Sequence, residues 1–158
     1  FSDAASAILI SKSTKNKIGP FELGADGSGA DALELPTDTN EIVMNGAKVL
    51  TFAMDVVPNN VNKLLKKIKT DKKNIHKFIF HQASKYILDN INRRLSIEKN
   101  KTFENYAKVG NTISASIPIA LKDAYIKRKI LVNKNIIVAG YGVGLSWGSA
   151  LIKWSKLL

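Results

Sequence analysis

An apolar run that ends in a histidine is the feature that most restricts how this chain can fold. Residues 78–80 (Phe-Ile-Phe) lead directly into His81, and a helix-length pattern follows over residues 84–95. The run predicts a buried strand, and a strand followed by a helix indicates an α/β fold. Ligands of open α/β sheets bind outside the carboxyl ends of strands. His81 therefore stands where a reacting group would be useful, although a lone histidine can equally close a strand and hydrogen-bond its neighbours.

Other segments of the chain also carry strand patterns. Residues 4–12 and 18–25 predict two strands joined by a basic turn at 15–17, and residues 135–139 and 145–154 predict two more. Residues 26–41 are acidic and contain glycine and proline, so they predict a surface loop. The glycine run 140–144 predicts a hairpin, because no helix follows it to complete a phosphate site.

Two further helices are predicted. After Asn45-Gly46, apolar residues recur at helical spacing as far as Ile68, and Pro58 is expected to end or kink this helix. The segment after residue 113 predicts a second helix with Pro118 in its first turn. Ser114 and Ser116 are the expected N-caps of that helix.

Composition describes one soluble globular domain. The chain has 158 residues, 45% of them hydrophobic and 23% charged, which suffices for one core. It contains no cysteine, so a disulfide, a Cys-based metal site and a thiol nucleophile within this chain are excluded. No apolar stretch is long enough to span a bilayer and no signal peptide is visible. We therefore expect a cytoplasmic protein without membrane contacts.

The chain is strongly basic. Lys and Arg number 24 against 13 Asp and Glu, a net charge of +11, which favours acidic partners such as nucleic acid, anionic lipid or an acidic protein. Many of the lysines lie within residues 63–77. Surfaces that bind nucleic acid usually interleave arginine and aromatic residues, and this segment does not. A solvated lysine face is the favoured interpretation, with a nucleic-acid-binding module as an alternative.

Three features together suggest chemistry. His81 follows a buried strand, Asn111 lies in a Gly-Asn-Thr turn, and the 140–144 run offers backbone N–H groups. A neutral imidazole and a carboxamide can both donate hydrogen bonds to one carbonyl oxygen. Such paired donors stabilise the oxyanion of acyl or enolate chemistry. The nucleophile is missing.

At these residues the chain resembles the carboxyl-terminal half of 3-oxoacyl-[acyl-carrier-protein] synthase III, a thiolase-fold condensing enzyme. The family's His-Gln-Ala-Asn is similar to residues 81–84, its Gly-Asn-Thr segment to 110–121, and its terminal glycine-rich Trp-Gly-Ser-Ala-Leu segment to 140–151. Residues 1–7 resemble its Phe-Gly-Asp stretch, and residues 44–46 its Met-x-Gly helix start. The resemblance covers nearly the whole chain in order.

The resemblance implies a fold and a reaction. The fold is one thiolase-like half, a mixed five-stranded sheet with helices on its faces, and residues 1–158 form the C-terminal domain. An upstream cysteine is acylated from acyl-CoA, and decarboxylative Claisen condensation with malonyl-[acyl-carrier protein] follows, as in the initiation of fatty acid biosynthesis. Because that cysteine belongs to the N-terminal half, we expect this chain alone to be inactive. Neither a metal nor a further cofactor is implied.

The resemblance also implies roles for particular residues. His81 and Asn111 match the pair that holds the malonyl thioester carbonyl, and Val143 falls where a backbone N–H contributes to the other oxyanion hole. Gly46 falls along the substrate tunnel. The docking patch for the acidic carrier protein corresponds to Lys85, Arg93 and Arg94.

The implied partners are the carrier protein, acyl-CoA, the N-terminal half and a second copy in a homodimer, without nucleic acid or membrane. The family's arginine is replaced by Tyr86, which puts carrier recognition in question. Ser84 in place of asparagine indicates divergence, so service in surface-polysaccharide or secondary metabolism is an alternative. A non-catalytic half of a heterodimeric synthase is another.

Overall fold

The computed structural model describes residues 1–12, 18–39 and 41–154. The strands are β1 (Ile18–Ala25), β2 (Leu33–Glu34), β3 (Val43–Met44), β4 (Lys77–Phe80), β5 (Asn135–Gly142) and β6 (Ser146–Lys153). The α-helices are α1 (Gly46–Lys67), α2 (Lys85–Leu95), α3 (Tyr106–Val109) and α4 (Ser116–Ile126). Short 3-10 helices are η1 (Gly27–Ala32), η2 (Lys72–Asn74), η3 (Lys99–Lys101) and η4 (Ile113–Ala115). The predicted turn at 15–17 lies outside the described residues.

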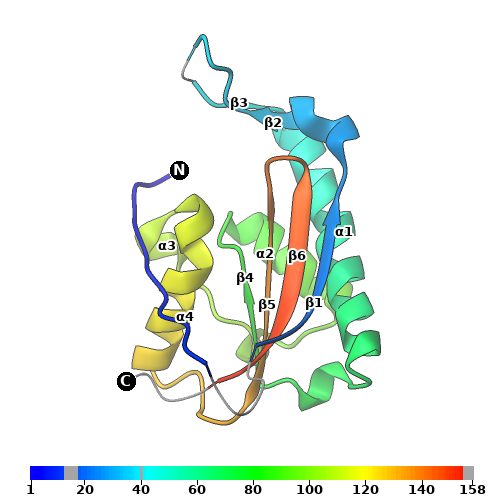
Figure 1. Ribbon diagram of the computed structural model, residues 1–158, viewed down its shortest axis with the longest axis vertical. Coiled ribbons are helices and arrows are strands. Elements are labelled where there is room, and N and C mark those ends of the chain that lie inside the picture. Colours follow the sequence, from blue (N-terminus) through cyan, green and yellow to red (C-terminus); the bar gives the residue numbers. More distant parts are fainter. Residues whose placement is uncertain (13–17, 40, 155–158) are drawn as a thin grey trace.

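A mixed sheet forms the middle layer, in the strand order β1-β6-β5-β4 (Figure 1). Strands β4 and β5 are parallel, whereas β6 is antiparallel to β5 and to β1. Alternate residues of β4 face opposite sides: Phe78 and Phe80 join the core under α1 and α2, and Ile79 joins the core under α4. The buried strand predicted from residues 78–80 is confirmed, because these residues lie in β4 and every residue of β4 is buried.

Helix α1 spans the whole amphipathic stripe. Asn45 is its N-cap, accepting a hydrogen bond from the Lys48 N–H at 3.1 Å. The expectation that Pro58 ends or kinks the helix was wrong as to ending it, since α1 continues through Pro58 to Lys67. An interior proline costs about 3 kcal/mol, but apolar residues on both sides of it are buried against the sheet and α2. No helix in the described ranges combines the length and hydropathy needed to cross a membrane.

The predicted strand at residues 4–12 is wrong for the described structure. These residues form neither strand nor helix and are exposed, with Leu9 86% accessible. The segment runs beside α4 (Figure 1), and just before it the Ser2 N–H donates to the Asn111 carbonyl at 2.9 Å. An apolar pattern indicates a preference for burial, but a strand also needs the unpaired edge of a sheet with which its backbone can form hydrogen bonds. Among the described residues, the main sheet therefore has four strands rather than the expected five.

Some of the remaining secondary-structure predictions are confirmed and others are not. The strand at 18–25 is confirmed as β1, and α2 is confirmed with Ser84 as its N-cap. The expected loop at 26–41 instead contains η1 and β2, and β2 pairs with β3 in a ribbon that projects from the sheet (Figure 1). The expected caps of α4 were wrong, because Ala115 is the N-cap residue and makes no side-chain cap bond. Ser116 is the first helical residue, and its hydroxyl is used elsewhere.

Candidate active site

His81 stands directly after β4, at its carboxyl end. Its backbone N–H extends the ladder to the Ala139 carbonyl at 2.9 Å. Its ring Nδ1 lies 2.6 Å from the hydroxyl of Ser116, which is only 1% exposed at the start of α4. Burial lowers the pKa of His81 to about 4, and a backbone hydrogen bond with Ile113 opposes that shift. The imidazole is therefore neutral at physiological pH.

Gln82 holds the loop that follows His81. Its side chain is fully buried, its Nε2 donates to the Phe80 carbonyl at 2.7 Å, and its Oε1 accepts from the Asn105 N–H at 2.9 Å. A buried amide with both ends bonded fixes the backbone on either side of it. In the sequence, Gln82 stands out only as part of a motif and Ser116 only as an expected cap. The serine carried no sequence signal for contact with a histidine 35 residues away.

The turn that carries Asn111 reaches the His81 ring through Ile113. The Ile113 N–H donates to the Asn111 Oδ1 at 3.0 Å, and the Ile113 backbone carbonyl, as an acceptor for the His81 ring, opposes the lowering of the His81 pKa. Gly110 allows this turn with φ +68, and a Cβ there would lie 2.1 Å from the Ser2 hydroxyl. The structure thus links the two predicted side chains through one intervening residue.

The hairpin between β5 and β6 approaches the same region. The Tyr141 ring packs edge-on against the His81 ring, with centroids 5.4 Å apart. Val143 lies two residues further along, is 63% exposed, and its carbonyl accepts the Ser146 hydroxyl at 2.7 Å. Gly46 is the exposed first residue of α1, and a Cβ on it would meet open space. The oxyanion role of Val143 and the tunnel role of Gly46 stay predictions.

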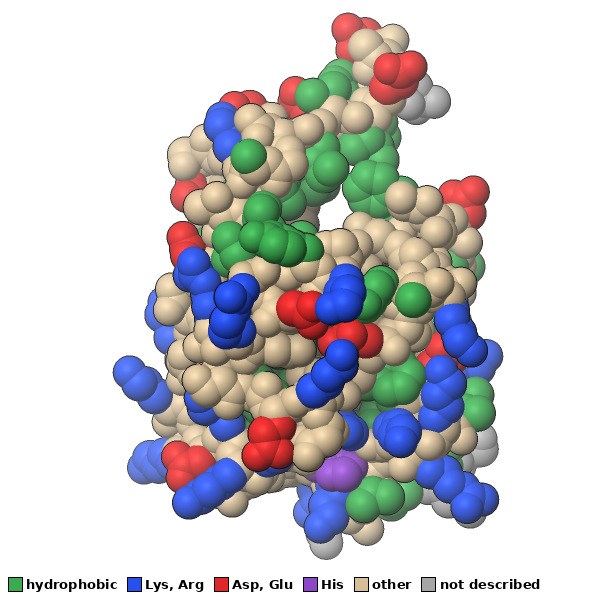
Figure 2. Space-filling model, turned by 180° about the vertical axis from the view of Figure 1, so that it is seen from behind, with side chains coloured by type: hydrophobic (Ala, Val, Ile, Leu, Met, Phe, Trp, Pro, Cys, Tyr) green, Lys and Arg blue, Asp and Glu red, His purple; other side chains and the backbone are tan. Residues whose placement is uncertain are grey.

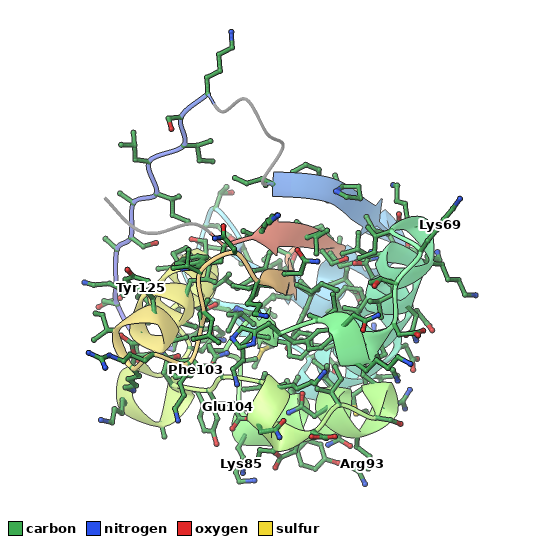
Figure 3. The ribbon with its side chains drawn as sticks, turned by 90° about the horizontal axis from the view of Figure 1, so that it is seen from below. Lys69, Lys85, Arg93, Phe103, Glu104 and Tyr125 are labelled. Atoms are coloured by element: carbon green, nitrogen blue, oxygen red, sulfur yellow. The ribbon has the colours of Figure 1, made fainter. Side chains whose placement is uncertain are left out.

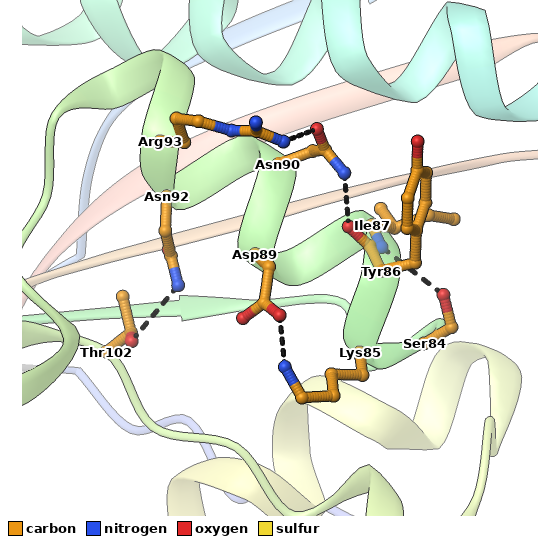
Figure 4. A network of polar contacts seen from close by, with 9 residues as sticks. All are labelled: Ser84, Lys85, Tyr86, Ile87, Asp89, Asn90, Asn92, Arg93 and Thr102. Carbon is orange, nitrogen blue, oxygen red and sulfur yellow. Dashed lines mark hydrogen bonds and ion pairs between the residues drawn. The ribbon is translucent and has the colours of Figure 1, made fainter.

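The three predicted carrier-docking cations lie on α2 and are largely compensated within the chain. Lys85 pairs with Asp89, and that hydrogen bond raises the pKa of Lys85 and lowers the pKa of Asp89. Arg94 pairs with Asp55 of α1 at 2.8 Å. Arg93 instead donates to the uncharged Asn90 side chain (Figure 4). Lys85 and Arg93 both point outward from α2 (Figure 3), so their side chains are accessible to a partner.

The lysine-rich segment lies at the opposite end of β4. Lys63, Lys66 and Lys69 are exposed and line a groove of about 780 Å³ beside η2. Basic side chains are spread over the lower part of the molecule with acidic ones between them (Figure 2). Lys77 departs from the expected solvated face: it is buried, it donates to the Asn100 carbonyl, and burial followed by the charge of Lys129 lowers its pKa.

Comparison with known proteins identifies the class. Residues 65–154 match the family described as 3-oxoacyl-[acyl-carrier-protein (ACP)] synthase III C terminal. The chain is 35% identical to beta-ketoacyl-[acyl-carrier-protein] synthase III of Staphylococcus aureus (strain Newman) over 157 residues, 99% of this chain and 50% of that protein. The chain therefore spans about half the length of the curated relatives it matches.

Solved structures agree. A 3-oxoacyl-(acyl carrier protein) synthase III from Pseudomonas aeruginosa PAO1 superposes with a TM-score of 0.87 at 29% identity, covering 94% of this chain and 48% of that one. The synthase III from Aquifex aeolicus VF5 superposes with a TM-score of 0.86 at 30% identity, covering 90% and 46%. The chain belongs to the 3-oxoacyl-[acyl-carrier-protein] synthase III family, as a C-terminal domain with a thiolase-like α/β fold.

Proposed function

We propose that this chain is the half of a decarboxylative condensing enzyme that binds the malonyl thioester. Family membership and the arrangement of His81 and Asn111 support the proposal. The relatives are named beta-ketoacyl-[acyl-carrier-protein] synthase III. By analogy, the substrates are an acyl-CoA and malonyl-[acyl-carrier protein], and a separate half supplies the acylated cysteine.

The observation that carries the proposal is the way in which Asn111 and His81 are bonded within the chain. Asn111 is bonded through its oxygen and His81 through Nδ1, so each side chain keeps a nitrogen that can donate to a ligand. The Ile113 N–H can only donate, so the Asn111 atom it meets is the oxygen. That leaves the Asn111 amide nitrogen available to donate to a ligand. His81 is held at Nδ1 by Ser116, which leaves Nε2 as the ring nitrogen that can donate. Two N–H groups converging on one oxygen form the donor set of an oxyanion hole.

The chemistry that these donors support is loss of carbon dioxide from the malonyl thioester. The electron pair of the breaking carbon–carbon bond moves into an enolate, and the negative charge collects on the thioester oxygen. His81 and Asn111 stabilise that oxygen by hydrogen bonds while the low pKa of His81 keeps the ring neutral. The enolate carbon then bonds to the acyl carbon of the acyl-cysteine, and the cysteine sulfur leaves as thiolate.

The test uses this chain joined to the half that supplies the cysteine. His81→Ala is expected to lower malonyl decarboxylation roughly 10²–10³-fold, the usual effect of removing one oxyanion donor. Acylation of the cysteine by acyl-CoA should continue. His76→Ala, at the other end of β4, is the matched control. Equal loss of both half-reactions in His81→Ala would contradict the role assigned to His81, and loss of neither would favour the non-catalytic partner half.

We further propose that the acidic carrier protein docks on the outer face of α2, with Arg93 as the main contact. Lys85 and Arg94 already pair with carboxylates, whereas Arg93 binds a neutral amide. Arg93→Glu is expected to raise the apparent KM for malonyl-[acyl-carrier protein] more than Arg94→Glu does, and the difference should shrink as salt rises. An effect independent of salt would indicate misfolding instead.

The place of the reaction in metabolism follows from the acyl donor. A short acyl-CoA as preferred primer would support initiation of fatty acid biosynthesis. A preference for an unusual acyl group would favour surface-polysaccharide or secondary metabolism. Competition among acyl-CoA primers with the assembled enzyme measures this directly, and gel filtration of the same preparation tests the proposed homodimer.

A further inference from the structure

Ser116 makes a contact that its position in the helix does not require. It is the first residue of α4, one position after the N-cap residue Ala115, so its hydroxyl is not the capping group of the helix. Its hydroxyl instead lies 2.6 Å from Nδ1 of His81, and the residue is 1% exposed. This buried hydroxyl therefore restricts the orientation and the protonation of the His81 ring.

The direction of this hydrogen bond follows from a second one. The Gln82 backbone N–H donates to the same Ser116 oxygen at 3.4 Å. A backbone N–H cannot accept, so it occupies a lone pair of the hydroxyl, and the one hydroxyl proton is left for Nδ1. If Nδ1 carried the proton instead, the serine oxygen would accept twice, and among the described residues its own proton would have no acceptor. Such an unpaired buried donor is costly.

We infer that Ser116 is a positioning residue that holds His81 in the tautomer with its proton on Nε2. One ring nitrogen of a neutral imidazole is a donor and the other an acceptor, and the bond made by one decides the state of the other. Burial lowers the pKa of His81 to about 4, so the ring is neutral near pH 7 and carries its one proton on either Nδ1 or Nε2. The catalytic consequence, an Nε2–H presented to the thioester oxygen, rests on the proposed function; the tautomer itself does not.

The chain supplies an internal reference for the measurement. It contains two histidines, and the other is held the opposite way round. The Leu131 backbone N–H donates to Nε2 of His76 at 3.1 Å, which places the proton of neutral His76 on Nδ1. The two imidazoles are thus expected to be opposite tautomers within one molecule.

The experiment is ¹⁵N NMR of the 158-residue chain with labelled histidine, at a pH where both rings are neutral. Long-range ¹H–¹⁵N correlations distinguish protonated from unprotonated ring nitrogens. The expected spectrum shows one ring protonated at Nε2 and one at Nδ1, and His76→Gln assigns them by removing the second. A wild-type spectrum with His81 protonated at Nδ1 would overturn the inference without any variant being needed.

The matched variants are Ser116→Ala and Ser116→Thr. Alanine removes the hydroxyl, so both His81 nitrogen shifts are expected to move toward the average of the two tautomers while those of His76 stay in place. Threonine keeps the hydroxyl and should restore the wild-type pattern. Unchanged His81 shifts in a folded Ser116→Ala chain would contradict the inference.

Activity of the assembled enzyme is a separate readout. Ser116→Ala is expected to lower kcat for decarboxylation roughly tenfold, less than removing a donor outright, with KM nearly unchanged and activity recovered in Ser116→Thr. If the tautomer shifts in the NMR experiment but kcat does not fall, the assignment of Ser116 stands and the proposed role of His81 in decarboxylation fails. The two proposals can therefore be refuted independently.

Discussion

The buried neutral imidazole of His81 makes the stability of this chain depend on pH in a calculable way. The folded-state pKa is about 4, whereas an unfolded histidine titrates near about 6.5. Between those values the unfolded state binds more protons, so the free energy of unfolding falls as the pH falls through this window. From about pH 7.5 to about pH 5 the loss attributable to His81 is about 2 kcal/mol, and it reaches about 3 kcal/mol below the folded pKa.

Urea unfolding of the wild-type chain and of His81→Gln at both pH values isolates this contribution. Carboxylates also titrate in the window, but they are common to both proteins and cancel in the difference. The wild type is expected to lose about 2 kcal/mol more than His81→Gln on acidification. His76→Gln is the control, because burial and neighbouring lysines also lower the pKa of His76. Equal losses in the wild type and His81→Gln would refute the reasoning.

Three other changes test the packing. Ile79→Ala removes most of a fully buried side chain between β4 and α4 and is expected to lower the free energy of unfolding by about 2–5 kcal/mol, measured with urea. A decrease below about 1 kcal/mol would mean that the site collapses or is not packed as described. Gly110→Ala should destabilise the chain by about 1 kcal/mol or more, since φ is +68 and the new Cβ meets the Ser2 hydroxyl, and Ser2→Gly in the same background should recover part of it. Arg94→Ala should change stability by less than about 1 kcal/mol, because its pair with Asp55 is exposed, and a larger loss that persists in high salt would contradict that.

The strand–histidine–helix unit was predictable because all of its signals are local. The residues of β4 are uniformly apolar apart from Lys77, and Ser84 has the side chain that a helix N-cap needs. Local sequence patterns gave the wrong secondary structure where contacts with residues distant in the sequence decided it. Residues 4–12 are as apolar as many strands, yet they meet no ladder edge in the described structure. Pro58 should have ended a solvent-exposed helix, but packing along both halves of α1 carries the helix through it.

In the candidate site too, the residues could be named from the sequence, whereas their contacts could not. His81 and Asn111 could be named from residue types and motif resemblance, but their relation to each other runs through the backbone of Ile113, which no pattern marks. The proposed docking residues Lys85, Arg93 and Arg94 are surface charges, as the sequence indicated. The pairing of Lys85 with Asp89 and of Arg94 with Asp55 depends on one neighbour a helical turn away and on another on a different helix.

For this protein, the sequence by itself determined the alternation of strands and helices, the basic charge and the residue types at positions 81 and 111. Those properties depend on single side chains and on spacing along the chain. Only the tertiary structure decided which atom of His81 and of Asn111 is bonded within the chain, because that depends on Ser116 and Ile113, which a separate helix and turn bring to the end of β4. Which atom of a side chain is hydrogen-bonded depends on where donors and acceptors lie in the folded chain, and the order of residues along the sequence does not specify this.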